Sequence, residues 1–183
     1  AVPYPLIVFS PGFMIDRKSY VSYGQRLASH GFVAVLQRVP AEYDHARYRD
    51  NTVELLNWLL RPTGTSADRI KGFVDEKRIG IAGHSLGGKV GILVAAADSR
   101  IKAYFGIDPV DSNSTSASAE IAKIKLPGGL PLALIGETVS KMGRPPCAPA
   151  EFNYEMLYGK ASSPVFAITM PGVAHGDWVD NCT

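Results

Sequence analysis

The feature that most constrains this chain is the pentapeptide Gly83-His84-Ser85-Leu86-Gly87, which has the pattern G-x-S-x-G. The apolar run 78–82 before it predicts a strand, and the apolar stretch 88–97 after it predicts a largely buried helix. A serine on such a tight turn takes strained backbone angles and needs small neighbours, because a Cβ beside it would clash. The turn raises the serine hydroxyl above the sheet, next to the N–H groups that begin the helix. We therefore expect Ser85 to be a nucleophile; the alternative is a glycine-rich turn with an incidental serine.

Short apolar runs alternate with helical patterns along the rest of the chain. Strands that are apolar on both faces and separated by helices are typical of a parallel sheet covered on both sides. Because 183 residues show neither an internal repeat nor a linker, we expect one domain, 1–183, of the α/β class with about six strands. Beyond the strand that precedes Ser85, strands are predicted at 6–9, 32–36, 103–107, 132–135 and 165–169, and helices at 20–29, 51–60 and 152–158.

The composition is ordinary for a globular protein, with 46% hydrophobic residues, 20% charged residues and a net charge of +2. The charge is too small, and too evenly spread, to favour nucleic acid as a partner. No apolar stretch approaches the ~20 residues that a membrane-spanning helix needs. The few histidines and cysteines have no spacing typical of a metal site, so we expect neither a metal nor another cofactor.

The two cysteines, Cys147 and Cys182, both lie in the C-terminal third of the chain. They allow two interpretations. A disulfide between them would favour a secreted or extracytoplasmic protein, because disulfides persist in oxidising compartments. The alternative is two unrelated thiols.

A serine hydroxyl is a poor nucleophile near neutral pH, so it needs a base within hydrogen-bond reach and an acid that orients the base. Hydrolases with this turn carry the three residues in the order Ser, Asp or Glu, His. Of the four histidines only His175 follows Ser85, in the loop after the last predicted strand, which makes it the expected base. The adjacent His84 is expected to point away from the serine. We expect His30 to end a helix and His45 to face water from a charged loop.

Three carboxylates at strand ends are candidates for the acid. Asp108 is favoured, since Pro109 fixes the backbone beside it. Glu137, after the following strand, is the alternative. Asp111 is expected to support the acid.

Acyl transfer also needs two N–H donors for the oxyanion. We expect them to be the backbone N–H groups of Leu86, which follows the nucleophile, and of Phe13, in the loop after the first strand. Gly12 would let this loop approach closely. The apolar side chains of Phe13, Met14 and Leu86 would then line an acyl pocket; plain core packing is the alternative. The wider candidates for the pocket wall are Met14, His84, Asp111 and Glu137.

These motifs resemble a known family, the α/β-hydrolases of the chlorophyllase type. More distantly they resemble platelet-activating-factor acetylhydrolases and cutinase-like polyesterases. The resemblance runs from Tyr4 onward, and is carried by the turn through Gly88-Lys89, by Asp108-Pro109-Val110-Asp111 and by His175-Gly176-Asp177. It implies an α/β-hydrolase fold and a metal-independent serine carboxylesterase acting on an apolar or lipid-like ester, with Ser85, Asp108 and His175 as its triad.

The sequence also departs from the chlorophyllase pattern. Ser10-Pro11-Gly12-Phe13 is more like the polyesterase and acetylhydrolase branch, and Leu86 stands where chlorophyllases usually have arginine. The chain lacks two N-terminal strands and a closing helix of the larger fold, so we expect either a minimal hydrolase or part of a longer protein. A lipase, a polyesterase and an acetylhydrolase are therefore alternative enzymes, and a hydrolase-fold ligand-binding protein is the non-enzymatic alternative.

Overall fold

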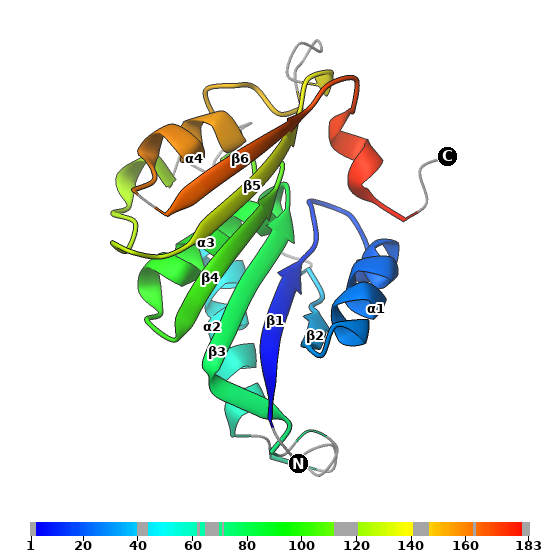
Figure 1. Cartoon of the computed structure of the whole chain (residues 1–183), viewed down its shortest axis with the longest axis vertical. Helices are drawn as coiled ribbons and strands as arrows, with labels where there is room; N and C mark the ends of the chain where they lie inside the picture. Colours follow the sequence, from blue (N-terminus) through cyan, green and yellow to red (C-terminus); the bar gives the residue numbers. More distant parts are fainter. Residues whose placement is uncertain are drawn as a thin grey trace.

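A computed structural model of the chain describes residues 3–39, 44–61, 63–64, 70, 72–111, 121–140, 147–162 and 164–180. Six strands form one sheet in the order β2-β1-β3-β4-β5-β6, and every neighbouring pair is parallel (Figure 1). The strands are β1 Tyr4–Ser10, β2 Val33–Leu36, β3 Val74–His84, β4 Ile101–Ile107, β5 Leu132–Glu137 and β6 Val165–Met170. The helices are α1 Val21–Ser29, α2 His45–Leu60, α3 Leu86–Ala97 and α4 Tyr154–Lys160, with 3-10 turns η1 Arg17–Tyr20, η3 Ile121–Lys123 and η5 His175–Trp178.

The predicted parallel sheet with helices on both faces is confirmed, and the main difference in the elements is the start of α2. This helix begins six residues before the predicted 51, because the Asp44 carboxylate accepts hydrogen bonds from Ala46 N and Arg47 N and caps it. His45 is therefore a half-buried residue of the first helical turn. The expectation of a water-facing loop histidine is wrong.

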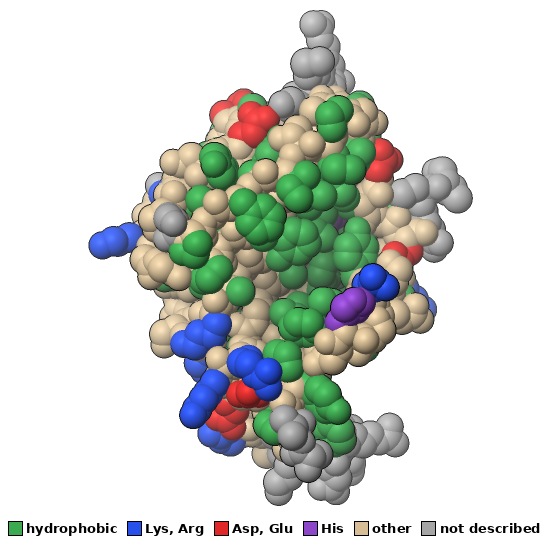
Figure 2. All heavy atoms as spheres, in the orientation of Figure 1, with side chains coloured by type: hydrophobic (Ala, Val, Ile, Leu, Met, Phe, Trp, Pro, Cys, Tyr) green, Lys and Arg blue, Asp and Glu red, His purple; other side chains and the backbone are tan. Residues whose placement is uncertain are grey.

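One face of the sheet is only partly covered. Ile7 and Phe9 on β1 pack there against Tyr20 and Tyr23, at the start of α1, and against Trp178 of η5. Farther along the sheet this face is open, and Figure 2 shows hydrophobic side chains gathered over the strands. The hollow has a volume of about 590 Å³. Its floor includes the small residues Gly80, Ala82, Ala103 and Ala133, and its apolar surroundings include Phe105 and Phe166, which are exposed.

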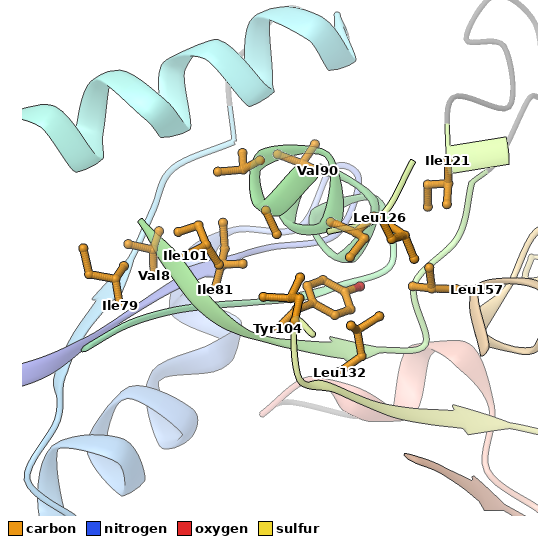
Figure 3. Packing of buried hydrophobic residues seen from close by; sticks show 14 of the residues in the cluster. Val8, Ile79, Ile81, Val90, Ile101, Tyr104, Ile121, Leu126, Leu132 and Leu157 are labelled. Atoms are coloured by element: carbon orange, nitrogen blue, oxygen red, sulfur yellow. The ribbon is translucent and has the colours of Figure 1, made fainter. Parts of the chain in front are cut away.

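The opposite face carries the main core, beneath α2, α3 and α4 (Figure 3). Alternate residues of the strands, such as Val8, Ile81 and Leu132, point to this side, as the two-residue period of a strand requires. Helix α3 is buried along nearly its whole length, which explains why its sequence is apolar apart from Lys89. Burying one such aliphatic side chain stabilises the fold by about 1.5–3 kcal/mol, so α3 is held firmly in place.

The parallel strands all end at the same edge, which brings together loops that are distant in sequence. The ladder continues just past the strands: Ser85 N donates to Ile107 O at 3.0 Å, and Asp108 N donates to Ile135 O at 2.6 Å. The residues after β3, β4 and β5 are therefore fixed relative to one another. Within the described ranges, no helix has the length and apolar character that crossing a bilayer requires.

Candidate active site

Ser85 stands alone between β3 and α3, with φ 55° and ψ −122°. These angles lie in a region that L-residues rarely adopt. Glycines stand two residues before and two residues after Ser85, at positions 83 and 87. A Cβ on Gly87 would lie 1.9 Å from the carbonyl oxygen of Ser10, and a Cβ on Gly83 would lie 2.4 Å from the carbonyl carbon of Gly87. The backbone around the serine is thus packed too closely for any side chain at either glycine.

The structure brings Ser85, His175 and Asp108 together in hydrogen-bonding order. Ser85 Oγ lies 2.8 Å from His175 Nε2, and His175 Nδ1 lies 2.6 Å from Asp108 Oδ2. A carboxylate accepts hydrogen bonds only, so Nδ1 carries the proton in the neutral ring. Nε2 is then the acceptor for the serine hydroxyl. This is the tautomer that lets an imidazole take a proton from a nucleophile.

The alternative acid, Glu137, is buried and contacts the loop that carries His175 through Ser140 rather than the imidazole itself. Its Oε2 accepts a hydrogen bond from Ser140 N at 2.7 Å, and Ser140 Oγ accepts one from His175 N at 2.8 Å. Nearby, Val139 N donates to Val173 O at 3.2 Å. Glu137 therefore supports the backbone of the histidine loop, whereas the carboxylate on the imidazole is that of Asp108.

Asp111 forms a fully buried ion pair with Lys89, with 3.0 Å between Nζ and Oδ1. Its other oxygen accepts a hydrogen bond from Ile121 N at 2.9 Å. Lys89 belongs to the first turns of α3, three residues beyond Leu86, so this pair ties the loop that carries Asp108 to the helix behind Ser85. Asp111 and Glu137 have no exposed surface, which contradicts the expectation that they line a substrate pocket.

His84 is also fully buried and is not part of a pocket wall. Its ring lies beside that of His175, with 4.7 Å between the two ring centroids. Nδ1 lies 2.7 Å from the hydroxyl of Tyr20, and Nε2 lies 3.0 Å from the backbone oxygen of His175. Burial, with a smaller contribution from the neighbouring His175, lowers the pKa of His84 from 6.5 to about 3. The ring is therefore neutral near pH 7.

The loop after β1 comes close to Ser85 at Gly12. A Cβ at this glycine would lie 3.3 Å from the Cβ of Ser85 and 3.1 Å from Nδ1 of His84. The loop then turns tightly: Ile15 N donates to Gly12 O at 3.2 Å, and Met14 has φ 57°. As a result Phe13 and Met14 are 48% and 74% exposed, so neither is a core residue.

Leu86 behaves differently from these two side chains. It is 6% exposed and belongs to the main core, in agreement with the packing alternative for its side chain. It is the first residue of α3, so its N–H has no acceptor four residues earlier within the helix.

Two residues of this region, Tyr20 and Ser140, had no sequence signal, and Lys89 was marked only by the family resemblance, which gave it no role. Each of the three has a partner at least 22 positions away, namely His84 for Tyr20, Asp111 for Lys89 and His175 for Ser140, and local sequence patterns do not predict such contacts. Among the residues that the structure describes, no group of three or more His, Cys, Asp or Glu side chains could hold a metal ion. Cys147 is exposed, and Cys182 lies outside the described residues, so their pairing stays a prediction.

Comparisons with known proteins agree with this geometry. A family model described as PET hydrolase-like matches residues 3–128, more than half of the chain. Chlorophyllase-2 of Arabidopsis thaliana is 23% identical over 98% of this chain and 62% of its own length, and chlorophyllase type 0 of Chenopodium album is 27% identical over 92% and 54%. A cutinase of Thermobifida fusca is 27% identical over 64% of this chain and 38% of its own length. The chain thus spans less than two thirds of these relatives.

A solved structure supports the same conclusion about the fold. The α/β hydrolase GrgF from Penicillium sp. sh18 superposes with a TM-score of 0.70 at 14% identity, covering 97% of this chain and 84% of GrgF. The predicted fold class is therefore confirmed. The chain has the α/β-hydrolase fold and belongs to the PET hydrolase-like family.

Proposed function

We propose that this protein is a serine carboxylester hydrolase that acts through an acyl-enzyme. The observation that carries the proposal is the continuous relay from Ser85 Oγ through the His175 ring to the buried Asp108 carboxylate. Membership in the PET hydrolase-like family and similarity to chlorophyllases and cutinases support the same reaction class. The relay requires no metal for acyl transfer.

The chemistry follows from where the protons lie. His175 Nε2 takes the proton of Ser85 as its oxygen attacks the ester carbonyl, and Asp108 stabilises the imidazolium that forms. His175 then gives this proton to the departing alcohol, leaving an acyl group on Ser85. A water molecule activated by the same nitrogen attacks the acyl-enzyme, releases the acid and restores the serine.

The oxyanion of each tetrahedral intermediate needs two donors. We assign them to the backbone N–H groups of Leu86 and Phe13. The position of Leu86 at the start of α3, and the close approach of Gly12 to Ser85, support the assignment. Each such donor is worth about 3 kcal/mol of transition-state stabilisation in related sites.

An apolar ester is the substrate class that fits the surroundings best. The exposed Phe13 and Met14 stand in the loop beside Ser85, where they would contact the acyl or alcohol part of a substrate. Chlorophyllase and cutinase relatives offer two candidate substrates, a chlorophyll ester and a polyester such as cutin. The segment Ser10-Pro11-Gly12-Phe13, which is more like the polyesterase branch than the chlorophyllase pattern, favours the polyester.

The test is turnover of 4-nitrophenyl esters of increasing acyl length by the wild type, by Ser85→Ala and by a control, Ser29→Ala, which alters an exposed serine of α1. We expect turnover by the wild type and the control, and a loss of about a million-fold in Ser85→Ala. Equal turnover by Ser85→Ala would overturn the mechanism. Stoichiometric binding of the esters without turnover by any of the three would favour the ligand-binding alternative. Parallel assays on chlorophyll and on a polyester film then separate the two substrates.

A further inference from the structure

We propose that His84 is a positioning residue for the base: its Nε2–H group holds the backbone carbonyl of His175, and the Tyr20 hydroxyl fixes the tautomer in which it can do so. The consequence for catalysis rests on the proposed function. The proton arrangement itself rests only on geometry.

The proton arrangement follows from what each partner can accept. A backbone carbonyl cannot donate, so the 3.0 Å contact between His84 Nε2 and the oxygen of His175 requires a proton on Nε2. In the neutral ring Nδ1 is then an acceptor, and the Tyr20 hydroxyl, 2.7 Å away, must donate to it. The tyrosine oxygen in turn accepts the N–H of Gly12 at 3.3 Å. These partners fix the donor and the acceptor in each of the three hydrogen bonds, from Gly12 to Tyr20, from Tyr20 to His84 and from His84 to His175.

Burial keeps the protons of His84 and Tyr20 in these positions. His84 and Tyr20 are fully buried, and burial lowers the pKa of His84 while it raises the pKa of Tyr20. The proton on the phenol therefore stays there, and the imidazole stays neutral across the range in which esterases work. The titratable side chains that interact with the pair include His175, Tyr23, Tyr48 and Asp180.

These hydrogen bonds join three segments that a serine hydrolase must align: the oxyanion loop, the turn that carries the nucleophile and the loop that carries the base. Gly12 directly precedes Phe13 in the oxyanion loop, and His84 directly precedes Ser85. The third segment carries His175, whose backbone is held on both sides, at N by Ser140 and at O by His84. Without the bond from His84, the ring of His175 would still contact Asp108, but its backbone could move. A displacement of about 1 Å in such a site lowers the rate by about a hundredfold.

Two amide substitutions separate the role of each ring nitrogen. The amide nitrogen of glutamine can stand near the position of Nε2, so His84→Gln retains a donor to the His175 carbonyl. The shorter asparagine amide stands near Nδ1, so His84→Asn keeps a partner for Tyr20 but loses that donor. Tyr20→Phe removes the hydroxyl that sets the tautomer. The matched control is Tyr104→Phe, which removes another buried hydroxyl bond, 2.9 Å to Gly88 O, on the opposite face of the sheet.

We expect His84→Asn and Tyr20→Phe to lower kcat for a 4-nitrophenyl ester by about 10- to 100-fold with KM unchanged within about twofold. His84→Gln should recover most of kcat, and Tyr104→Phe should leave it unchanged although its Tm falls by as much as that of Tyr20→Phe. Equal kcat in His84→Gln and His84→Asn, or in the two tyrosine variants, would overturn the positioning role.

A second measurement does not depend on catalysis. Nitrogen-15 NMR of the histidine rings should show His84 as the Nε2–H tautomer at pH 5–8, and as a mixture of tautomers in Tyr20→Phe. A Nδ1–H or protonated ring in the wild type would overturn the inference, whatever the activity. If the wild type hydrolyses no ester, the proposed function fails, and the NMR result alone then decides the proton arrangement.

Discussion

Asp108 Oδ2 lies 2.6 Å from Nδ1 of His175, although 67 residues separate them in the chain. The carboxylate is fully buried at the end of β4, and its backbone has φ 39°, a conformation that aspartate adopts more readily than most residues. The backbone of Asp108 is fixed by this positive φ and by the hydrogen bond from its N–H to Ile135 O on β5, and its carboxylate therefore faces the imidazole. This contact identifies Asp108 rather than Glu137 as the acid that we propose for the triad.

Asp108→Asn should lower kcat by about 10⁴-fold, because an amide nitrogen facing Nδ1 favours the wrong tautomer of His175. Steady-state kinetics on a soluble ester measure this directly. The matched variant is Glu137→Gln, which keeps the shape of the side chain that supports Ser140. Its kcat should fall far less than that of Asp108→Asn. If kcat fell more in Glu137→Gln than in Asp108→Asn, Glu137 rather than Asp108 would be the acid of the triad.

Gly87→Ala should destabilise the protein by at least about 3 kcal/mol, since a Cβ 1.9 Å from a backbone oxygen forces β1 and α3 apart. Gly159→Ala is the control, because Gly159 is exposed in α4 and a Cβ there meets nothing within 4 Å. The control should be more stable than the wild type by about 0.5–1 kcal/mol, the usual gain from alanine in a helix. Urea denaturation measures the free energy of unfolding of both variants. An unchanged stability in Gly87→Ala would show that the close packing of Gly87 against Ser10 O is not required.

Lys89→Met should cost about 3–5 kcal/mol of unfolding free energy, because it leaves the Asp111 carboxylate buried without its cation. Asp111→Asn should cost a similar amount for the converse reason. The double variant Lys89→Met/Asp111→Asn should be clearly more stable than the sum of the two losses implies. Additive losses in this double-mutant cycle would mean that the two side chains do not act as a pair.

The stability of the protein should fall as the pH drops from about 6.5 towards about 3. Over this interval His84 gains a proton in the unfolded chain, whereas its lowered pKa keeps it neutral in the folded protein. The unfolded state then binds more protons, so acid favours unfolding, by up to about 1.4 kcal/mol per pH unit. Denaturation at pH 4, 5, 6 and 7 should show a shallower pH dependence for His84→Gln. Identical slopes would contradict the neutral, buried state of His84.

Much of this architecture is visible in the sequence because it rests on local patterns. The apolar runs mark all six strands, and glycines on both sides of Ser85 mark the turn that its backbone requires. The order of residues along the chain singles out His175, since a parallel sheet gathers the loops after its strands at one edge. The apolar pattern does not predict where α2 begins, because the helix starts at one capping residue, Asp44, in front of a polar first turn.

The burial of polar side chains could not be predicted in the same way. Asp111, Glu137 and His84 carry the residue types of a substrate pocket, yet each is fully buried. Asp111 and His84 contact the distant residues Lys89 and Tyr20, and Glu137 accepts the N–H of Ser140, which in turn contacts His175. These contacts depend on tertiary packing between segments, which neither composition nor periodicity records. They explain why these three polar side chains hold the loops around Ser85 and have no exposed surface.

The most direct test of the central claim is the reaction of the protein with a fluorophosphonate, followed by mapping of the modified residue by mass spectrometry. Only a serine activated by a neighbouring base reacts rapidly with such a probe. We predict that one phosphonyl group forms, on Ser85, and that it forms far more slowly in His175→Ala. An unmodified Ser85, or the same rate in the wild type and in His175→Ala, would contradict it.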